Sequence, residues 1–169
     1  MGISSSEKVY FGNDGWYFYT MDSNMEIGMG RYLLSQEQLA EIAAKQQKIS
    51  DYYDAKGIEY LLVLTPSKVS VYTEYVADGL TVGYTMADQL AEYLAENTTV
   101  RVVNTKPSVI AAKNRGQLFW RTDTHWTQLG AYAAYSGILD YMSTWRTTNT
   151  SPVAADFSMS ATGYGEFNA

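Results

Sequence analysis

The chain has 169 residues, of which 46% are hydrophobic, so it can form one sizeable core but is too short for two ordinary domains. Lys and Arg number 12 against 18 Asp and Glu, and the net charge of -6 without a basic run argues against binding to nucleic acid or anionic lipid. The absence of cysteine excludes disulfides, thiolate metal sites and a Cys nucleophile, and no apolar stretch reaches the roughly 18 residues of a membrane span.

The first part of the chain predicts a β-hairpin. Residues 1–8 show no signal-peptide pattern, and we expect them to be disordered or introduced by cloning, with any native signal or anchor removed. Residues 9–19 place two aromatic, strand-forming runs on either side of Gly12-Asn13-Asp14-Gly15, an arrangement typical of a hairpin. A loop is expected from there to about Leu34.

A helix and a buried strand follow this loop. The helix begins after Ser35, which forms a capping box with Gln38, and apolar residues at helical spacing continue until Gly57. Residues 58–65 are almost continuously apolar and end at Pro66, which is typical of a strand buried on both faces of a parallel sheet. The side chains expected in the core of this central strand are Leu61, Val63 and Leu64.

Helices and strands then alternate to about residue 142. The pattern predicts a helix over 86–96, a strand over 100–103, a helix over 107–115, a strand over 117–120 and a helix over 127–142. Right-handed crossovers between parallel strands place helices on both faces of an open sheet. The predicted fold class is therefore α/β, a three-layer domain with an open, mainly parallel sheet, followed by an irregular tail.

The strongest candidate for chemistry is the sequence Arg-Thr-Asp-Thr-His-Trp at 121–126, just after the strand predicted over 117–120. Sites in open α/β sheets form at the carboxyl ends of strands. His125 is the only histidine, and the carboxylate of Asp123 could accept its Nδ1 proton and leave Nε2 free to act as a base. A lone His beside an Asp is, however, more often a structural residue.

Two further stretches accompany this motif in the same order. They are 11–18 (Phe-Gly-Asn-Asp-Gly-Trp-Tyr-Phe) and 65–72 (Thr-Pro-Ser-Lys-Val-Ser-Val-Tyr), before 123–132 (Asp-Thr-His-Trp-Thr-Gln-Leu-Gly-Ala-Tyr). Together they resemble the alginate O-acetyltransferase (AlgX/AlgJ) family and the related DHHW proteins. The resemblance implies an SGNH-hydrolase-like fold, with residues 9–169 as the N-terminal major part of one such domain, incomplete at its C-terminus.

The resemblance also implies acyl transfer. A Ser would attack an acetyl ester or thioester, His125 would take the hydroxyl proton, and Asp123 would orient the imidazole. The implied partners are an acetyl donor and a polysaccharide, the acceptor being a hydroxyl of an exopolysaccharide or other cell-envelope glycan, with a membrane-bound acyltransferase as one acetyl source. Neither a cofactor nor a metal is expected, and the implied location is periplasmic or extracellular.

The sequence departs from the family pattern at the nucleophile. In the family the Ser follows the Asp-His pair on a strand-to-helix turn, whereas neither Gly-Asp-Ser nor Gly-x-Ser-x-Gly occurs in these 169 residues. The serines after the pair lie in the predicted helix or the tail: Ser136, Ser143, Ser151, Ser158 and Ser160. We therefore expect the nucleophile to be missing from this chain, and the chain alone to be inactive.

Four residues are lesser candidates for substrate binding: Lys68, Tyr72, Arg121 and Trp126. Lys68 could bind a carboxylate, although a lysine just past a strand is more often solvated, and Trp126 by itself would indicate packing. Two alternatives stay open beside the transferase. One is a non-catalytic carbohydrate-binding or assembly module, and the other is an esterase that uses water as the acceptor.

Overall fold

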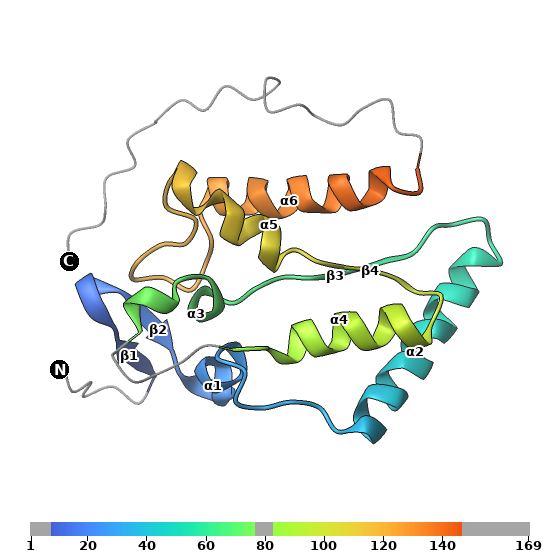
Figure 1. Ribbon diagram of the computed structural model, residues 1–169, viewed down its shortest axis with the longest axis horizontal. Helices are drawn as coiled ribbons and strands as arrows, with labels where there is room; N and C mark the ends of the chain where they lie inside the picture. The colour runs from blue at the N-terminus through green and yellow to red at the C-terminus, as the bar shows by residue number, and fades with distance from the viewer. Residues whose placement is uncertain (1–7, 77–82, 147–169) are drawn as a thin grey trace.

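The computed structural model describes residues 8–76 and 83–146. Within these ranges a two-stranded parallel sheet lies between two pairs of helices, and an antiparallel hairpin packs at one end of the molecule (Figure 1). The strands are β1 Val9–Phe11, β2 Tyr17–Tyr19, β3 Leu61–Leu64 and β4 Arg101–Asn104. The helices are α1 Asn24–Gly28, α2 Gln36–Asp54, α3 Lys68–Val71, α4 Met86–Asn97, α5 Lys106–Ala111 and α6 Gln128–Ser143.

The expected hairpin is present. β1 and β2 pair antiparallel from Val9 opposite Tyr19 to Phe11 opposite Tyr17, around a 3-10 turn over Asn13–Gly15. Asp14 takes a positive φ of 55° in that turn, a conformation that Asp and Asn adopt more readily than other non-glycine residues. The hairpin therefore confirms the first predicted element.

The parallel sheet organises the layers. β3 and β4 pair parallel, from Leu61 opposite Arg101 to Leu64 opposite Asn104, and they coincide closely with the parallel strands predicted over 58–65 and 100–103. α2 and α4 cover one face of the sheet, and α5 and α6 cover the other (Figure 1). The predicted capping box of Ser35 with Gln38 is present at the start of α2, and Thr85 forms a second capping box with Asp88 at the start of α4.

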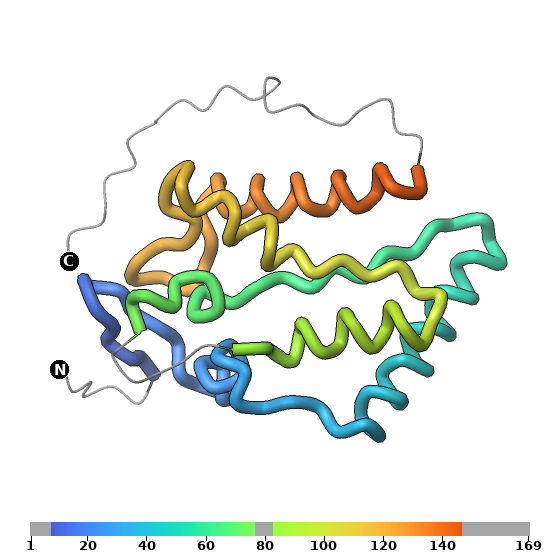
Figure 2. Tube along the Cα trace, viewed as in Figure 1, coloured from blue at the N-terminus to red at the C-terminus, as the bar shows by residue number. Residues whose placement is uncertain are grey.

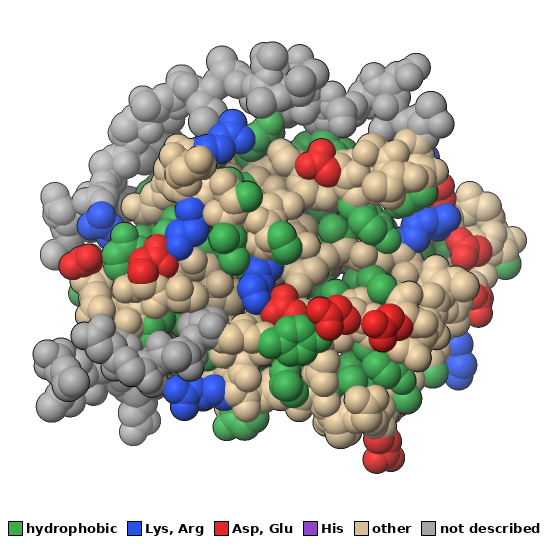
Figure 3. Space-filling view, viewed as in Figure 1, with side chains coloured by type: hydrophobic (Ala, Val, Ile, Leu, Met, Phe, Trp, Pro, Cys, Tyr) green, Lys and Arg blue, Asp and Glu red, His purple; other side chains and the backbone are tan. Residues whose placement is uncertain are grey.

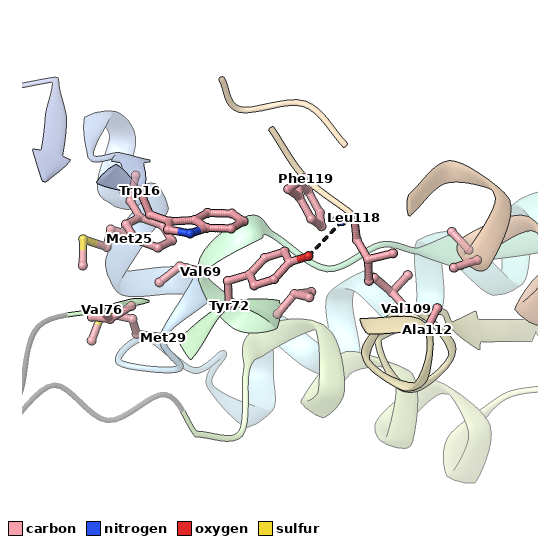
Figure 4. Packing of buried hydrophobic residues seen from close by; sticks show 14 residues of the cluster. Trp16, Met25, Met29, Val69, Tyr72, Val76, Val109, Ala112, Leu118 and Phe119 are labelled. Carbon is pink, nitrogen blue, oxygen red and sulfur yellow. Dashed lines mark hydrogen bonds between the residues drawn. The ribbon is translucent and has the colours of Figure 1, made fainter. Parts of the chain in front are cut away.

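Two apolar clusters hold these layers together. The smaller one joins α2, α4 and the sheet through Ala43, Leu94 and Val102. The larger one lies where the hairpin, α1, α3 and α5 meet residues 118–119, and its rings include Trp16, Tyr72 and Phe119 (Figure 4). The larger cluster thus includes Leu118 and Phe119, which begin the segment that carries Asp123 and His125.

The structure differs from the sequence prediction at the strand expected over 117–120. Only Phe119 forms a bridge there, antiparallel to Trp126, so this segment is not part of the parallel sheet. Its backbone groups are used elsewhere: the N–H of Leu118 donates to the hydroxyl of Tyr72 at 2.8 Å, and the carbonyl of Leu118 accepts from the N–H of Thr127 at 2.8 Å. A pattern of apolar residues cannot reveal such non-local hydrogen bonds.

Other differences concern shorter elements. The loop expected before Leu34 contains α1, and α3 follows Pro66 where no helix was predicted. Leu61, Val63 and Leu64 belong to a strand as predicted. Their side chains were expected in the core but are only half-buried, because β3 pairs only with β4 among the described residues. No helix in the described ranges is long and apolar enough to cross a membrane. The predicted leading segment and irregular tail lie almost wholly outside the described residues.

Candidate active site

The Asp-His motif lies in the loop of residues 118–127 (the 118–127 loop), whose two ends are joined by backbone hydrogen bonds. Its base is closed by the N–H of Thr127, which donates to the carbonyl of Leu118, and by the N–H of Trp120, which donates to the carbonyl of His125 at 3.1 Å. The loop extends from between α5 and α6 toward the hairpin (Figure 2), where the N–H of Tyr17 donates to the carbonyl of Arg121 at 2.9 Å. The hairpin therefore fixes the outer part of the loop.

Asp123 and His125 form the hydrogen bond that their spacing predicts. His125 Nδ1 lies 2.6 Å from Asp123 Oδ1, and the backbone N–H of His125 donates to the same oxygen at 2.8 Å. That backbone N–H, and then the imidazole, hold the pKa of Asp123 below its usual range, so the carboxylate stays charged. With Nδ1 as the donor, Nε2 is left free, and 80% of the imidazole side chain is exposed.

Lys68 lies beneath this pair. It follows β3 at the start of α3, and its residue is only 7% exposed, which contradicts the expectation of a solvated lysine. Its ammonium donates to three carbonyl oxygens of the 118–127 loop, those of Trp120 at 3.1 Å, Arg121 at 3.0 Å and Asp123 at 2.9 Å. Burial lowers the pKa of Lys68 to about 8, while the charge of Asp123 opposes this shift.

A cavity of about 410 Å³ adjoins the loop. Thr124, which lies between Asp123 and His125, contributes to its wall, although the two members of the pair do not. The other lining residues come from the hairpin, α1, the carboxyl end of β3 and the loop: Phe18, Tyr19, Asn24, Pro66, Ser67, Lys68, Val69 and Phe119. The pair therefore flanks a hollow at the carboxyl end of a sheet strand, and the hollow is large enough for a small organic group.

The remaining candidates divide between the core and the surface. Tyr72 is buried, its ring lies 4.2 Å from that of Trp16, and its hydroxyl holds the amide of Leu118. Trp126 is half-buried against the larger cluster, and Arg121 is exposed. Among these, Arg121 has the exposure that contact with a large substrate requires.

The contribution of the hairpin to the site was not predicted from the sequence. Phe18 and Tyr19 form a wall of the cavity, and β2 binds the 118–127 loop, although the hairpin lies about a hundred residues earlier in the chain. The signal that could have shown this is the order of the aromatic motif at 11–18 and the Asp-His motif, since both belong to the same resemblance.

Comparison with known proteins agrees with this geometry. The model of a family described as an SGNH hydrolase-like domain, acetyltransferase AlgX, matches residues 9–165. The chain belongs to this family. The match covers nearly the whole sequence, and the three motifs that suggested the family all lie inside the matched range.

Relatives with names in this family include two probable alginate O-acetylases AlgJ. The protein from Pseudomonas putida is 34% identical over 151 residues, which is 86% of this chain and 37% of that protein. The protein from Pseudomonas syringae is 29% identical over 130 residues, 75% of this chain and 31% of that protein. The chain therefore spans about a third of the length of the curated relatives it matches.

Solved structures support the SGNH-like α/β fold. The O-acetyltransferase domain of Pseudomonas putida AlgJ superposes with a TM-score of 0.63 at 28% identity, covering 85% of this chain and 50% of that one. Bacillus cereus PatB1, solved with a sulfonyl adduct, superposes with a TM-score of 0.61 at 15% identity, over 89% of this chain and 50% of that one. At this low identity the PatB1 likeness shows the fold alone.

Proposed function

We propose that this chain carries the acid-base part of an enzyme that transfers an acetyl group to a hydroxyl of an exopolysaccharide, of the alginate type or another cell-envelope glycan. The observation that carries the proposal is the 2.6 Å contact between His125 Nδ1 and Asp123 Oδ1, with the rest of the imidazole open to solvent. The relatives named as alginate O-acetylases support the substrate class.

The pair has the properties that general base catalysis requires. A charged Asp123 orients the imidazole and stabilises the imidazolium that forms when Nε2 accepts a proton. In the proposed reaction Nε2 removes the proton of a Ser hydroxyl, the Ser oxygen attacks the acetyl carbonyl of the donor, and the donor leaves with the proton returned from His125. The polysaccharide hydroxyl then attacks the acetyl-enzyme while His125 accepts its proton, the bond between the Ser oxygen and the acetyl group breaks, and His125 returns the proton to the Ser oxygen.

The proposed Ser is not among these 169 residues. No glycine-flanked Ser of the strand-to-helix type occurs in the sequence, and the 118–127 loop contains no serine. We therefore propose that the nucleophile comes from another segment of the complete protein, and that residues 9–169 form the major N-terminal part of one domain. The acetyl donor, a membrane-bound acyltransferase as its source, and an exported location are part of the same proposal.

The test is acetyl transfer by the complete protein that carries this chain, measured with an activated acetyl ester and an oligosaccharide acceptor. His125→Ala and Asp123→Asn are expected to lower kcat by about 10²–10⁴-fold, because each removes the oriented base. Their double variant should lose little more than His125→Ala alone, since the two residues act as a unit. Asp51→Asn, which changes an exposed carboxylate on α2, is the control.

Full turnover by the His125→Ala variant would refute the proposed role of the pair. An inactive wild-type protein that binds the oligosaccharide with micromolar affinity would favour the carbohydrate-binding module instead. Transfer to water alone, with no acetylated oligosaccharide formed, would indicate the esterase.

A further inference from the structure

Lys68 is the one buried ammonium group in the described residues that donates to the loop carrying Asp123 and His125. A buried lysine is costly unless its charge and its N–H groups are satisfied. Here all three donors of the ammonium are used by carbonyl oxygens at 2.9 to 3.1 Å, and all three carbonyls belong to the same loop, within four residues of one another.

We propose that Lys68 is a positioning residue for the Asp123–His125 pair, because its ammonium binds three backbone carbonyl oxygens of the 118–127 loop and so fixes the position of the pair at the edge of the cavity. One of the three bonds is to the carbonyl of Asp123 itself. The proposal differs from substrate binding, since the donors that would contact a substrate carboxylate are already in use.

The groups around the ammonium of Lys68 favour its charged form at this buried position. The hairpin contributes two rings, Trp16 and Phe18, whose centroids lie 5.7 Å and 5.3 Å from Nζ. Rings at this distance attract a cation, and they also exclude water from the carbonyl contacts. The facing charged group is Asp123, whose carboxylate is stabilised in turn by the ammonium. Lys68 thus connects the core under the hairpin to the exposed pair.

Apart from the bonds at the base of the loop, few contacts hold its middle residues. Besides the contacts of Lys68, two backbone hydrogen bonds hold these residues. The N–H of Tyr17 donates to the carbonyl of Arg121, and the N–H of Trp120 donates to the carbonyl of His125. The side chains of Asp123 and His125 are 56% and 80% exposed, so packing does little to orient them. Loss of three charge-assisted hydrogen bonds should therefore increase the motion of the pair, and a displacement of about 1 Å in a catalytic group can cost up to about 10²-fold in rate.

The kinetic test rests on the proposed function and uses the complete protein with an activated acetyl ester. Lys68→Met, which keeps the length of the side chain and removes its donors, is expected to lower kcat about tenfold or more with KM within about twofold. Lys68→Arg should recover part of kcat, because a guanidinium also donates to carbonyls. Lys113→Met is the matched control, since Lys113 also binds a backbone carbonyl, that of Val71, and lies over the ring of Tyr72.

A second test does not depend on turnover. Hydrogen exchange of residues 118–127 in the complete protein should be faster in Lys68→Met than in the wild type, and unchanged in Lys113→Met. Because burial lowers the pKa of Lys68 to about 8, protection of this loop, corrected for the intrinsic rate, should fall in the wild type as the pH rises through 8. The Lys68→Arg variant should not show this fall, since arginine keeps its charge.

The outcomes separate the two proposals. Faster exchange in Lys68→Met with no acetyl transfer by the wild type would leave the positioning of the loop intact and refute the proposed function. A raised KM with kcat unchanged in Lys68→Met would overturn the positioning role in favour of substrate binding. Exchange of the loop that is equal in wild type and Lys68→Met would also overturn it, even if the rest of the protein remains folded.

Discussion

At the scale of single residues, a few buried polar atoms determine how the 118–127 loop is attached to the core. The hydroxyl of Tyr72 accepts the N–H of Leu118 at 2.8 Å, and this bond is visible in the close view of the larger cluster (Figure 4). Both residues are buried, and burial is the main reason that the pKa of Tyr72 is raised, so the hydroxyl stays neutral. A buried amide without a partner costs free energy, and this hydroxyl supplies the partner.

Tyr72→Phe should therefore destabilise the protein by about 1–3 kcal/mol, because the amide of Leu118 would be left buried and unsatisfied. The ring itself is retained, so its contacts with Trp16 and Phe119 should persist. Chemical denaturation followed by tryptophan fluorescence measures the change. Tyr75→Phe is the control, because the Tyr75 ring stacks on Trp16 while its hydroxyl makes no hydrogen bond among the described residues. Equal stability of the two variants would contradict the prediction.

At the scale of elements, the start of α6 is fitted closely to the base of the 118–127 loop. Thr127 caps the helix by accepting the N–H of Gly130 at 3.2 Å, and its hydroxyl donates to the carbonyl of Gln117 at 2.7 Å. Gly130 lies so near the carbonyl of Leu118 that a Cβ there would overlap the oxygen. The motif that continues from His125 into α6 thus contains a cap and a close approach, and both position the loop.

Gly130→Ala should destabilise the protein by about 1–3 kcal/mol, since a methyl group would push α6 away from the loop. Alanine favours a helix by up to about 1 kcal/mol over glycine, and this gain is too small to offset the overlap with backbone. Thermal unfolding measures the change. Gly83→Ala should leave the midpoint nearly unchanged, because a Cβ at Gly83 meets no atom within 4 Å. A Gly130→Ala variant that is more stable than the wild type would contradict the prediction.

At the scale of the whole molecule, one polar network joins α4, β4 and α5 across the carboxyl edge of the sheet. Asp88 accepts from the ammonium of Lys106 at 2.5 Å, from the amide of Asn104 at 2.7 Å, and from both the N–H and the hydroxyl of Thr85. This network lies where acidic side chains gather over α4 in the space-filling view (Figure 3). Burial would raise the pKa of Asp88, but these hydrogen bonds outweigh it, and the pKa is lowered.

Stability should therefore fall in acid, and Asp88 should account for part of the fall. A carboxyl whose pKa is lower in the folded state stabilises the fold above its unfolded pKa of about 4, and this contribution is lost as the pH falls through the folded value. Asp88→Asn should reduce the free energy of unfolding at pH 7 and flatten its decline below pH 4. Glu41→Gln, which removes an exposed pair with Lys45, should change the decline much less. Matching curves for wild type and Asp88→Asn would contradict this.

Local patterns gave reliable expectations where an element is stabilised mainly by its own residues. The hairpin, the capped starts of α2 and α4, and the parallel pairing of β3 with β4 agree with capping signals and apolar periodicity. The contact between Asp123 and His125 was also predictable, because two residues of separation in a turn bring a carboxylate within reach of Nδ1. Family resemblance extended this to the SGNH-like fold, which the comparisons confirm.

The sequence by itself thus determined the order of most elements, the family and the geometry of the Asp-His pair. Only the tertiary structure decided that residues 117–120 do not form a sheet strand, that Lys68 is buried under the loop, and that the hairpin forms a wall of the cavity. The physical reason is the range of the interactions involved. Capping and periodicity act within about one to four turns of helix or across a short hairpin, whereas Lys68 and Tyr72 bind backbone groups 46 to 55 residues away.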